Sequence, residues 1–119
     1  MTRSILLVDD DPVFRGLARR FLTAAGLTVI GEADSVSAAL TAVASIEPAG
    51  ALVDIELPDG NGVALARHLV ALPWQPYVLL TSIDADAASD DDVRRSGAIA
   101  FVPKADLPNS PLAQLLGKE

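Results

Sequence analysis

Apolar and polar residues alternate along the chain in two patterns. Short apolar runs rich in β-branched residues predict strands at 4–8, 27–32, 50–53, 77–81 and 98–102. Between them, apolar residues recur at helical spacing: Phe14, Leu17, Ala18, Phe21 and Leu22; Val36, Leu40, Val43 and Ala44; Val63, Leu65, Ala66, Leu69 and Val70. This alternation predicts an α/β protein, with a doubly wound, five-stranded parallel sheet and helices on both faces.

The helical pattern is weaker in the last third of the chain. A fourth helix is expected within 86–96, although Val93 is its only large apolar residue. A short final helix of about two turns is expected, with Asn109 or Ser110 as its cap and Gly117 at its end. One face of that helix carries its three leucines: Leu112, Leu115 and Leu116.

Composition narrows the class of protein further. The chain of 119 residues is expected to form one domain over 1–119, with no disulfides because it has no cysteine. No signal peptide or membrane-spanning run is apparent, so a cytoplasmic protein without membrane contact is expected. The net charge is −7 and the basic residues are scattered, so this chain alone is not expected to bind nucleic acid.

The second predicted strand ends near Glu32 and Asp34, which are expected towards the edge of the sheet, and polar side chains also follow the other four strands. They are Asp9 and Asp10 after the first strand, Asp54 after the third, Thr81 and Ser82 after the fourth, and Lys104 after the fifth. Sites in open parallel sheets form at the carboxyl ends of the strands, at the point where the strand order reverses. We therefore expect these side chains to converge there.

The converging residue types suit phosphoryl transfer. Carboxylates with no histidine or cysteine ligand favour Mg²⁺, with Mn²⁺ as the other possible ion. Lys104 adds a fixed positive charge and Thr81 a hydroxyl, and both are groups that bind phosphoryl oxygens. Asp54 ends the central strand and is therefore the natural nucleophile.

Four segments in order carry a family resemblance: "VDDDP" with its following arginine (8–15), "LVDIELPDGNG" (52–62), "LLTS" (79–82) and "FVPK" (101–104). Across essentially its whole length, the chain resembles the receiver domain of bacterial two-component response regulators. That resemblance implies the fold of the chemotaxis regulators, which is flavodoxin-like with strand order 2-1-3-4-5.

The resemblance also implies a metal site. By it, Asp10 and Asp54 bind Mg²⁺ through their carboxylates, and Asp9 acts through a water molecule. The backbone carbonyl of Glu56 would complete the protein's ligands.

The same resemblance assigns the phosphoryl chemistry. Asp54 would accept a phosphoryl group from a sensor histidine kinase, and Thr81 and Lys104 would contact the phosphoryl oxygens. Ser82, being small, would leave the approach to Asp54 open. Phe101 stands where the family has an aromatic switch residue whose rotamer couples to Thr81.

A receiver signals by protein contact and catalyses only its own phosphorylation and dephosphorylation. Its output would be a downstream protein or a missing C-terminal output domain. Pro103 before Lys104 and Ala105 after it resemble the branch that is often joined to helix-turn-helix domains. The fourth helix, fifth strand and final helix form the family's dimer surface. Here they are thinly anchored, so a phosphorylation-dependent homodimer is expected rather than a constitutive one.

Two other functions fit parts of the sequence. "DDDPV" (9–13) also resembles the opening motif of haloacid-dehalogenase-like phosphatases, with Asp9 as nucleophile and Asp11 as acid/base. That interpretation leaves Asp54 without a role. A pseudo-receiver that only binds a partner is the third possibility, and the complete acceptor set argues against it.

Several nearby residues are expected to be structural. Asp11 precedes a proline and is expected to cap the first helix. Asp59 is expected in a turn, with Gly60 and Gly62 supporting positive φ. His68, the only histidine, is expected on a helix surface.

Overall fold

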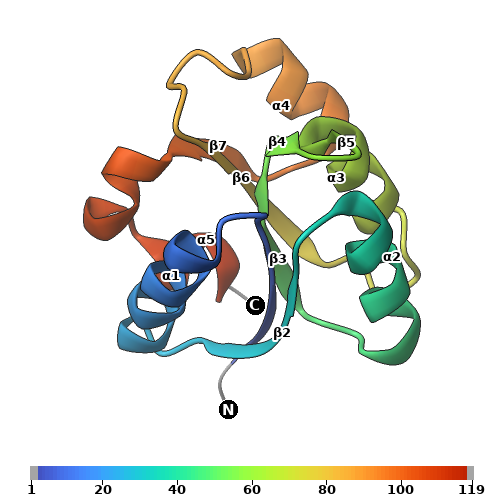
Figure 1. Cartoon of the computed structure of the whole chain (residues 1–119), viewed down its shortest axis with the longest axis horizontal. Coiled ribbons are helices and arrows are strands. Elements are labelled where there is room, and N and C mark those ends of the chain that lie inside the picture. The colour runs from blue at the N-terminus through green and yellow to red at the C-terminus, as the bar shows by residue number, and fades with distance from the viewer. Residues whose placement is uncertain (1–2, 118–119) are drawn as a thin grey trace.

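A parallel sheet forms the centre of the computed structural model, which describes residues 3–117 (Figure 1). Its strands are β1 (Ser4–Val8), β2 (Thr28–Ala33), β3 (Gly50–Asp54), β6 (Tyr77–Ser82) and β7 (Ala100–Pro103). They are ordered β2-β1-β3-β6-β7, and every neighbouring pair is parallel. The predicted α/β fold and its 2-1-3-4-5 strand order are therefore confirmed.

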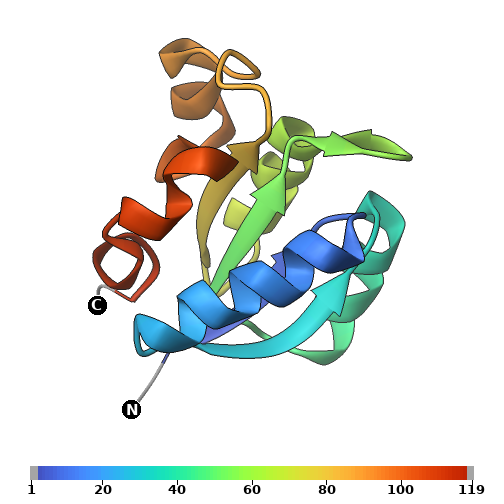
Figure 2. The same cartoon turned by 60° about the vertical axis from the view of Figure 1, so that its left-hand side comes forward.

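Helices cover both faces of this sheet (Figures 1 and 2). They are α1 (Pro12–Ala24), α2 (Val36–Ser45), α3 (Gly62–Val70), α4 (Asp90–Ser96) and α5 (Leu112–Leu116). A 3₁₀ helix, η1 (Lys104–Asn109), joins β7 to α5. The helices α1 and α5 lie on one face and α2 and α3 on the other, while α4 packs beside α3. In the described part of the chain, every helix is too short or too polar to cross a lipid bilayer.

The central strands are buried on both faces and divide the core in two. Successive strand side chains point to opposite faces, so Ile5 and Leu7 pack with α1, η1 and α5, whereas Leu6 and Val8 pack with α2 and α3. Burial on both faces explains why these strands are continuous apolar runs rather than alternating ones. It also leaves polar residues only at the strand ends, where the site forms.

The buried stripes on α1 and α2 are narrower than their apolar patterns predict. In α1 the buried positions are Phe14, Ala18 and Leu22, while Leu17 is 45% exposed. In α2 they are Ala39 and Val43, while Leu40 is 41% exposed and Ala44 is also exposed. Each helix meets the sheet along a single i, i+4 row, so an apolar residue one position off that row faces outward.

Two small elements were not predicted, and one cap was wrong. A hairpin of β4 (Glu56–Leu57) and β5 (Gly60–Asn61) follows β3, and η1 follows β7. Neither Asn109 nor Ser110 caps α5, because the residue at its N-cap is Pro111. The Ser110 hydroxyl instead donates to the carbonyl of Asp106 at 2.7 Å, which ends η1.

The expected positive φ in the turn after β3 is also wrong. Among the described residues, the glycines with positive φ are Gly26 and Gly97. Gly62 is needed for another reason: a Cβ there would lie 2.2 Å from the carbonyl oxygen of Asp54. Glycine is therefore the one residue that lets the start of α3 pass so close to the end of β3.

Aspartates fix the starts of two helices beside the site. Asp11 caps α1 as predicted, accepting a hydrogen bond from the Val13 amide at 3.0 Å. Asp59, expected only as a turn residue, also accepts from the amides of Val36 and Ser37 at 2.7 and 3.0 Å. These bonds lower the pKa of Asp59, and they tie the hairpin to the start of α2.

Candidate functional site

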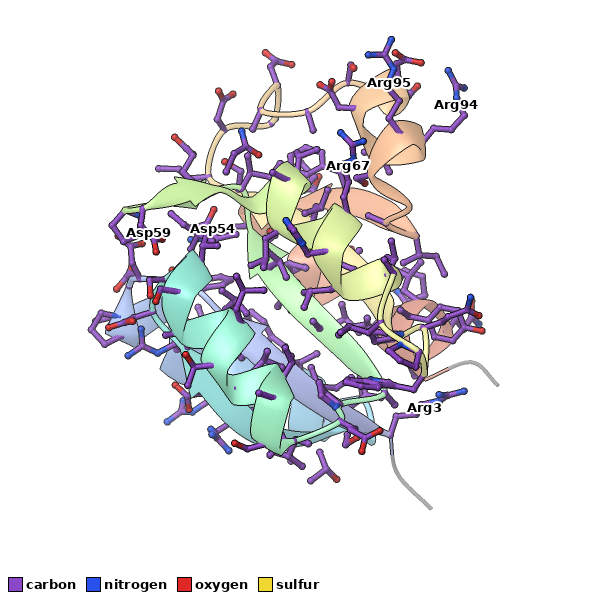
Figure 3. All side chains as sticks on the ribbon, turned by 90° about the vertical axis from the view of Figure 1, so that its right-hand side faces the viewer. Arg3, Asp54, Asp59, Arg67, Arg94 and Arg95 are labelled. Atoms are coloured by element: carbon purple, nitrogen blue, oxygen red, sulfur yellow. The ribbon has the colours of Figure 1, made fainter. Side chains whose placement is uncertain are left out.

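The carboxyl ends of the central strands bring the predicted residues together. Asp9 follows β1, and Asp54 ends β3 directly opposite Thr81 of β6. Ser82 is paired with Pro103, which places Lys104 just beyond the same edge. Figure 3 shows Asp54 at this edge and Arg3, which precedes β1, at the opposite end of the sheet. The convergence expected from the strand ends is therefore present.

Three carboxylates form the centre of the site. Asp9, Asp10 and Asp54 each offer an oxygen, and these three oxygens lie within 4.8 Å of one another. Asp9 and Asp54 are buried, whereas Asp10 is exposed. Two like charges at 4 Å repel by about 4 kcal/mol at an effective dielectric near 20, so the cluster is unfavourable by itself. A divalent cation shared by these oxygens would remove that repulsion.

The turn that carries Asp9 is fixed by hydrogen bonds. Its amide donates to the Ala33 carbonyl at 3.0 Å, and its Oδ1 accepts from the Asp11 amide at 2.8 Å. Arg15 Nη1 donates to the Asp9 carbonyl at 2.6 Å and is held in turn by Glu32, whose carboxylate lies 2.9 Å from Arg15 Nε. Asp9 therefore has a set orientation.

One oxygen of this cluster fits a metal ion in particular. Asp9 Oδ2 is the only buried side-chain oxygen or nitrogen in the described part of the chain that makes no hydrogen bond. Lys104 Nζ lies 2.8 Å away, which is an ion pair without the geometry of a directed hydrogen bond. Buried acceptors are normally satisfied. An oxygen-only donor set with spare acceptor capacity suits Mg²⁺ or Mn²⁺.

Lys104 supplies the positive charge of the site. Its Nζ lies 2.8 Å from Asp9 Oδ2 and 3.3 Å from Asp54 Oδ2. Burial lowers the pKa of Lys104, but the close ion pair with Asp9 and the charge of Asp54 outweigh that effect, so the net pKa is raised. The lysine therefore stays charged at neutral pH.

The surroundings of Asp54 shift its pKa upward. Its pKa is raised from 3.8 to about 6, chiefly by burial and also by the charge of Asp9. The Glu56 amide, which donates to Oδ1 at 3.1 Å, and the charge of Lys104 both lower it. At neutral pH Asp54 is therefore ionised, as a nucleophilic carboxylate must be.

The hydroxyls of β6 are both engaged by protein groups. Thr81 is buried, and its Oγ1 donates to the Val102 carbonyl of β7 at 2.7 Å. Ser82 Oγ donates to Glu56 Oε1 at 2.7 Å and accepts from the Asp84 amide at 3.0 Å. The small Ser82 thus holds the Glu56 side chain at the same edge of the sheet, a contact that the sequence did not indicate.

Phe101 lies in β7, partly buried against the core that underlies α2 and α3. It is paired with Leu80, next to the Thr81–Val102 pair. His68 is exposed on α3, as predicted. Figure 3 shows Arg67 on α3 and Arg94 and Arg95 on α4, where both α4 arginines form ion pairs with Asp91.

The comparisons with known proteins identify the class. Residues 5–113 match the response regulator receiver domain. Because this match covers most of the chain, the protein belongs to the receiver domain family of two-component signalling.

Curated relatives agree with that assignment. The chain is 36% identical over 115 residues to the DNA-binding transcriptional activator DevR/DosR of Mycobacterium tuberculosis, covering 96% of this chain and 52% of that one. It is 34% identical over 109 residues to protein-glutamate methylesterase/protein-glutamine glutaminase 3 of Hahella chejuensis, covering 90% and 31%. The chain thus spans about half or less of the length of these relatives.

Solved structures share the fold. A LuxR-family two-component response regulator from Aurantimonas is 26% identical, with a TM-score of 0.83 over 100% of this chain and 89% of that one. The signal receiver domain of the response regulator NarL from Mycobacterium tuberculosis is 27% identical, with a TM-score of 0.78 over 91% of each chain. The chemotaxis regulator CheY4 of Vibrio cholerae, 17% identical with a TM-score of 0.79, matches in fold.

Proposed function

We propose that this receiver accepts a phosphoryl group on Asp54 from the phosphohistidine of a sensor kinase, in a Mg²⁺-dependent reaction. The observation that supports this most is the convergence of Asp9, Asp10 and Lys104 on a buried, ionised Asp54. An Asp54 oxygen attacks phosphorus, the P–N bond to the histidine breaks, and the leaving nitrogen keeps the electron pair. The product is an acyl phosphate on Asp54.

Each neighbouring residue has a part in this proposal. Asp10, Asp54 and the Glu56 carbonyl would hold Mg²⁺, with Asp9 acting through water; Mn²⁺ could replace it. When bound, the ion offsets the negative charge of the phosphoryl oxygens. Lys104 binds one of those oxygens, because its ammonium already lies 3.3 Å from Asp54 Oδ2.

The switch follows from the same contacts. The Thr81 hydroxyl now donates to Val102, so binding a phosphoryl oxygen requires it to leave β7. That change would reach Phe101, the neighbour of Val102, and so the surface of α4, β7 and α5. A partner protein, an output domain as in the DNA-binding DevR/DosR, or a second copy of the chain would bind that surface in a phosphorylation-dependent way.

The other two candidate functions have less support. A phosphatase that uses Asp9 would leave Asp54 without a role, and its acid/base, Asp11, is engaged in capping α1. A pseudo-receiver would not need four charged groups gathered at this edge. We therefore propose a phosphoacceptor switch that acts on no substrate other than its own phosphoryl group.

The test is phosphorylation by a small phosphodonor, acetyl phosphate, followed by intact-mass spectrometry. Wild-type chain should gain one phosphoryl group only when Mg²⁺ is present, and Asp54→Asn should gain none. Persistent labelling of Asp54→Asn, with Asp9→Asn unlabelled, would point to the phosphatase instead. Absence of labelling in the wild-type chain would point to a pseudo-receiver.

A further inference from the structure

An aromatic ring forms one wall around the lysine of the site. Lys104 Nζ lies over the ring of Phe14, 4.1 Å from its centroid. The same ammonium lies 2.8 Å from Asp9 Oδ2 and 3.3 Å from Asp54 Oδ2. Lys104 is therefore held between two carboxylates and the face of a phenyl ring.

That ring is fixed by its surroundings. Phe14 lies in the first turn of α1, whose start is set by the Asp11 cap. It is 8% exposed and packs in the core formed by β1, α1, η1 and α5. Lysine has a flexible four-carbon stem, so the position of the Lys104 ammonium depends on the groups that hold it. The ring is thus the rigid partner in this contact.

A metal ion would compete with Lys104 for the two carboxylates but not for the Phe14 ring. Asp9 and Asp54 are the proposed metal ligands, so a bound cation would take the oxygens that now face Lys104. A neutral ring attracts an ammonium through its quadrupole and does not bind Mg²⁺ in this way. The Phe14 contact can therefore persist whichever ion the carboxylates face.

We propose that Phe14 is a positioning residue that keeps the Lys104 ammonium beside Asp54, ready to bind the phosphoryl group. This inference rests on the proposed phosphoacceptor function and adds a residue to it. It predicts two opposite effects when the ring is lost. A looser Lys104 should bind a phosphoryl group less well. It should also compete less with Mg²⁺ for Asp9 and Asp54, so Mg²⁺ should bind more tightly.

The experiment measures both affinities by backbone amide NMR on the full chain. Mg²⁺ is titrated alone, and beryllofluoride, a phosphoryl analogue, is titrated with saturating Mg²⁺. The variant is Phe14→Leu, and the matched control is Phe21→Leu, the same change on the same helix at a partly buried residue of the same core. For Phe14→Leu we expect beryllofluoride affinity to fall by about threefold to tenfold and Mg²⁺ affinity to rise by about twofold.

Two further variants separate the electrostatic effect of the Phe14 ring from the effect of its packing. Phe14→Tyr keeps an electron-rich face and should behave like wild type. A fluorinated phenylalanine at position 14 keeps the shape but weakens the quadrupole, and should shift both affinities in the same directions as leucine. Wild-type affinities in both Phe14→Leu and the fluorinated variant would overturn the inference.

Other outcomes are equally decisive. A fall in both affinities for Phe14→Leu would mean that the ring only supports the fold, and would overturn the positioning role. Equal effects of Phe21→Leu and Phe14→Leu would do the same. If wild type failed to bind beryllofluoride at all, the proposed function itself would fail. If wild type bound it and Phe14→Leu matched wild type in both titrations, only the role of Phe14 would fail.

Discussion

The ionised form of Asp54 is disfavoured by its surroundings in the folded chain. The residue is 5% exposed, and its pKa is raised from 3.8 to about 6, chiefly by burial. A carboxyl with a higher pKa in the folded chain than in the unfolded chain favours folding when protonated. Its contribution is fully present below about pH 4 and is lost as the pH rises through about 6.

Replacing Asp54 by asparagine should therefore stabilise the protein in a pH-dependent way. Without divalent cations, Asp54→Asn should raise the free energy of unfolding by about 1–3 kcal/mol at pH 7.5 and change it little at pH 4. Urea unfolding at the two pH values measures this difference. Asp34→Asn, at an exposed carboxylate after β2, is the control and should show no such pH dependence. An equal gain at both pH values would contradict the electrostatic explanation.

At the scale of the elements, the approach of α3 to β3 depends on one glycine. A Cβ on Gly62 would lie 2.2 Å from the Asp54 carbonyl oxygen and 2.7 Å from the Ile55 Cα, and both are backbone atoms that cannot turn away. Gly62→Ala should lower the free energy of unfolding by about 2–4 kcal/mol and slow phosphorylation, because the end of β3 must shift. Chemical denaturation and acetyl phosphate labelling measure the two effects.

Gly16→Ala is the matched control for that substitution. Gly16 lies within α1, and a Cβ there would have nothing within 4 Å. Alanine should stabilise α1 by about 0.5–1 kcal/mol and leave phosphorylation unchanged. Destabilisation of similar size by both changes would contradict the steric account of Gly62.

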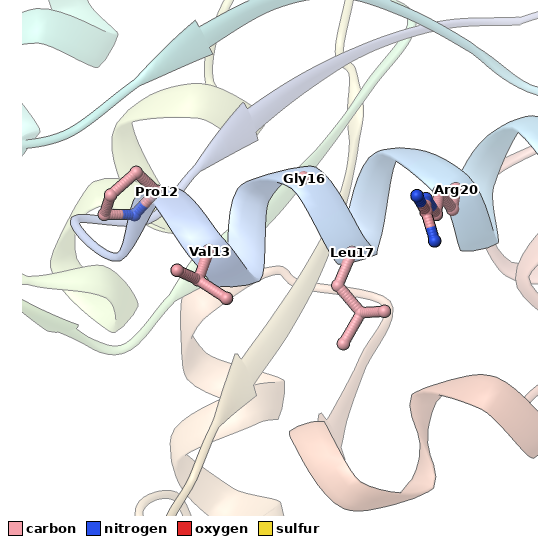
Figure 4. A pocket seen from close by; sticks show the side chains of 5 residues that line it. All are labelled: Pro12, Val13, Gly16, Leu17 and Arg20. Carbon is pink, nitrogen blue, oxygen red and sulfur yellow. The ribbon is translucent and has the colours of Figure 1, made fainter.

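The outer face of α1, the helix that begins beside the site, carries exposed apolar side chains. Figure 4 shows Val13 and Leu17 projecting from α1, where they line a shallow hollow together with Pro12, Gly16 and Arg20. Val13 is 79% exposed and Leu17 45%. In the proposed transfer a kinase histidine must reach Asp54, so the kinase would cover an element at this edge, and α1 begins three residues after Asp9.

Leu17→Asp should therefore impair transfer from a protein donor alone. We expect roughly a tenfold slower phosphotransfer from a sensor kinase that phosphorylates the wild-type chain, with unchanged labelling by acetyl phosphate. Leu40→Asp on α2 is the matched control, since Leu40 is 41% exposed. Slower labelling by acetyl phosphate in Leu17→Asp would indicate a damaged site rather than a lost contact.

For the whole molecule, the sequence predicts the fold well because long-range order follows from simple patterns. Strands buried on both faces must be continuous apolar runs, and Asp9, Asp54 and Lys104 follow from strand ends alone. The contacts that the sequence did not predict join segments that are far apart along the chain. No local pattern indicates that Phe14 faces Lys104 or that Asp59 accepts hydrogen bonds from the first amides of α2.

Glycine and leucine positions illustrate the same limit. Gly62 is required by a close approach of β3, not by its own φ, so a rule about turns gave the wrong reason. Leu17 fits a helical apolar stripe, yet α1 meets the sheet along a narrower row, so it is exposed. Local periodicity reports which residues can be buried, and only the packing of the whole chain decides which ones are.

Metal binding should be visible in the stability of the entire molecule. An ion that binds the folded chain alone raises its free energy of unfolding by RT ln(1 + [ion]/Kd), or about 1.4 kcal/mol at tenfold excess over Kd. For a chain of this size that corresponds to a rise in Tm of about 3–6 °C. Thermal unfolding with and without Mg²⁺ measures it.

Screening of the net charge of −7 could also raise the Tm in the presence of Mg²⁺. Two controls distinguish screening from binding at the site. Screening acts on all charges, so Na⁺ at equal ionic strength would then stabilise the chain as well as Mg²⁺ does. Site binding depends on the three converging carboxylates, so Asp10→Asn should lose most of the Mg²⁺ effect while Asp34→Asn keeps it. Equal Mg²⁺ stabilisation of wild type and Asp10→Asn would mean that the ion acts by screening, and that the carboxylate cluster does not hold it.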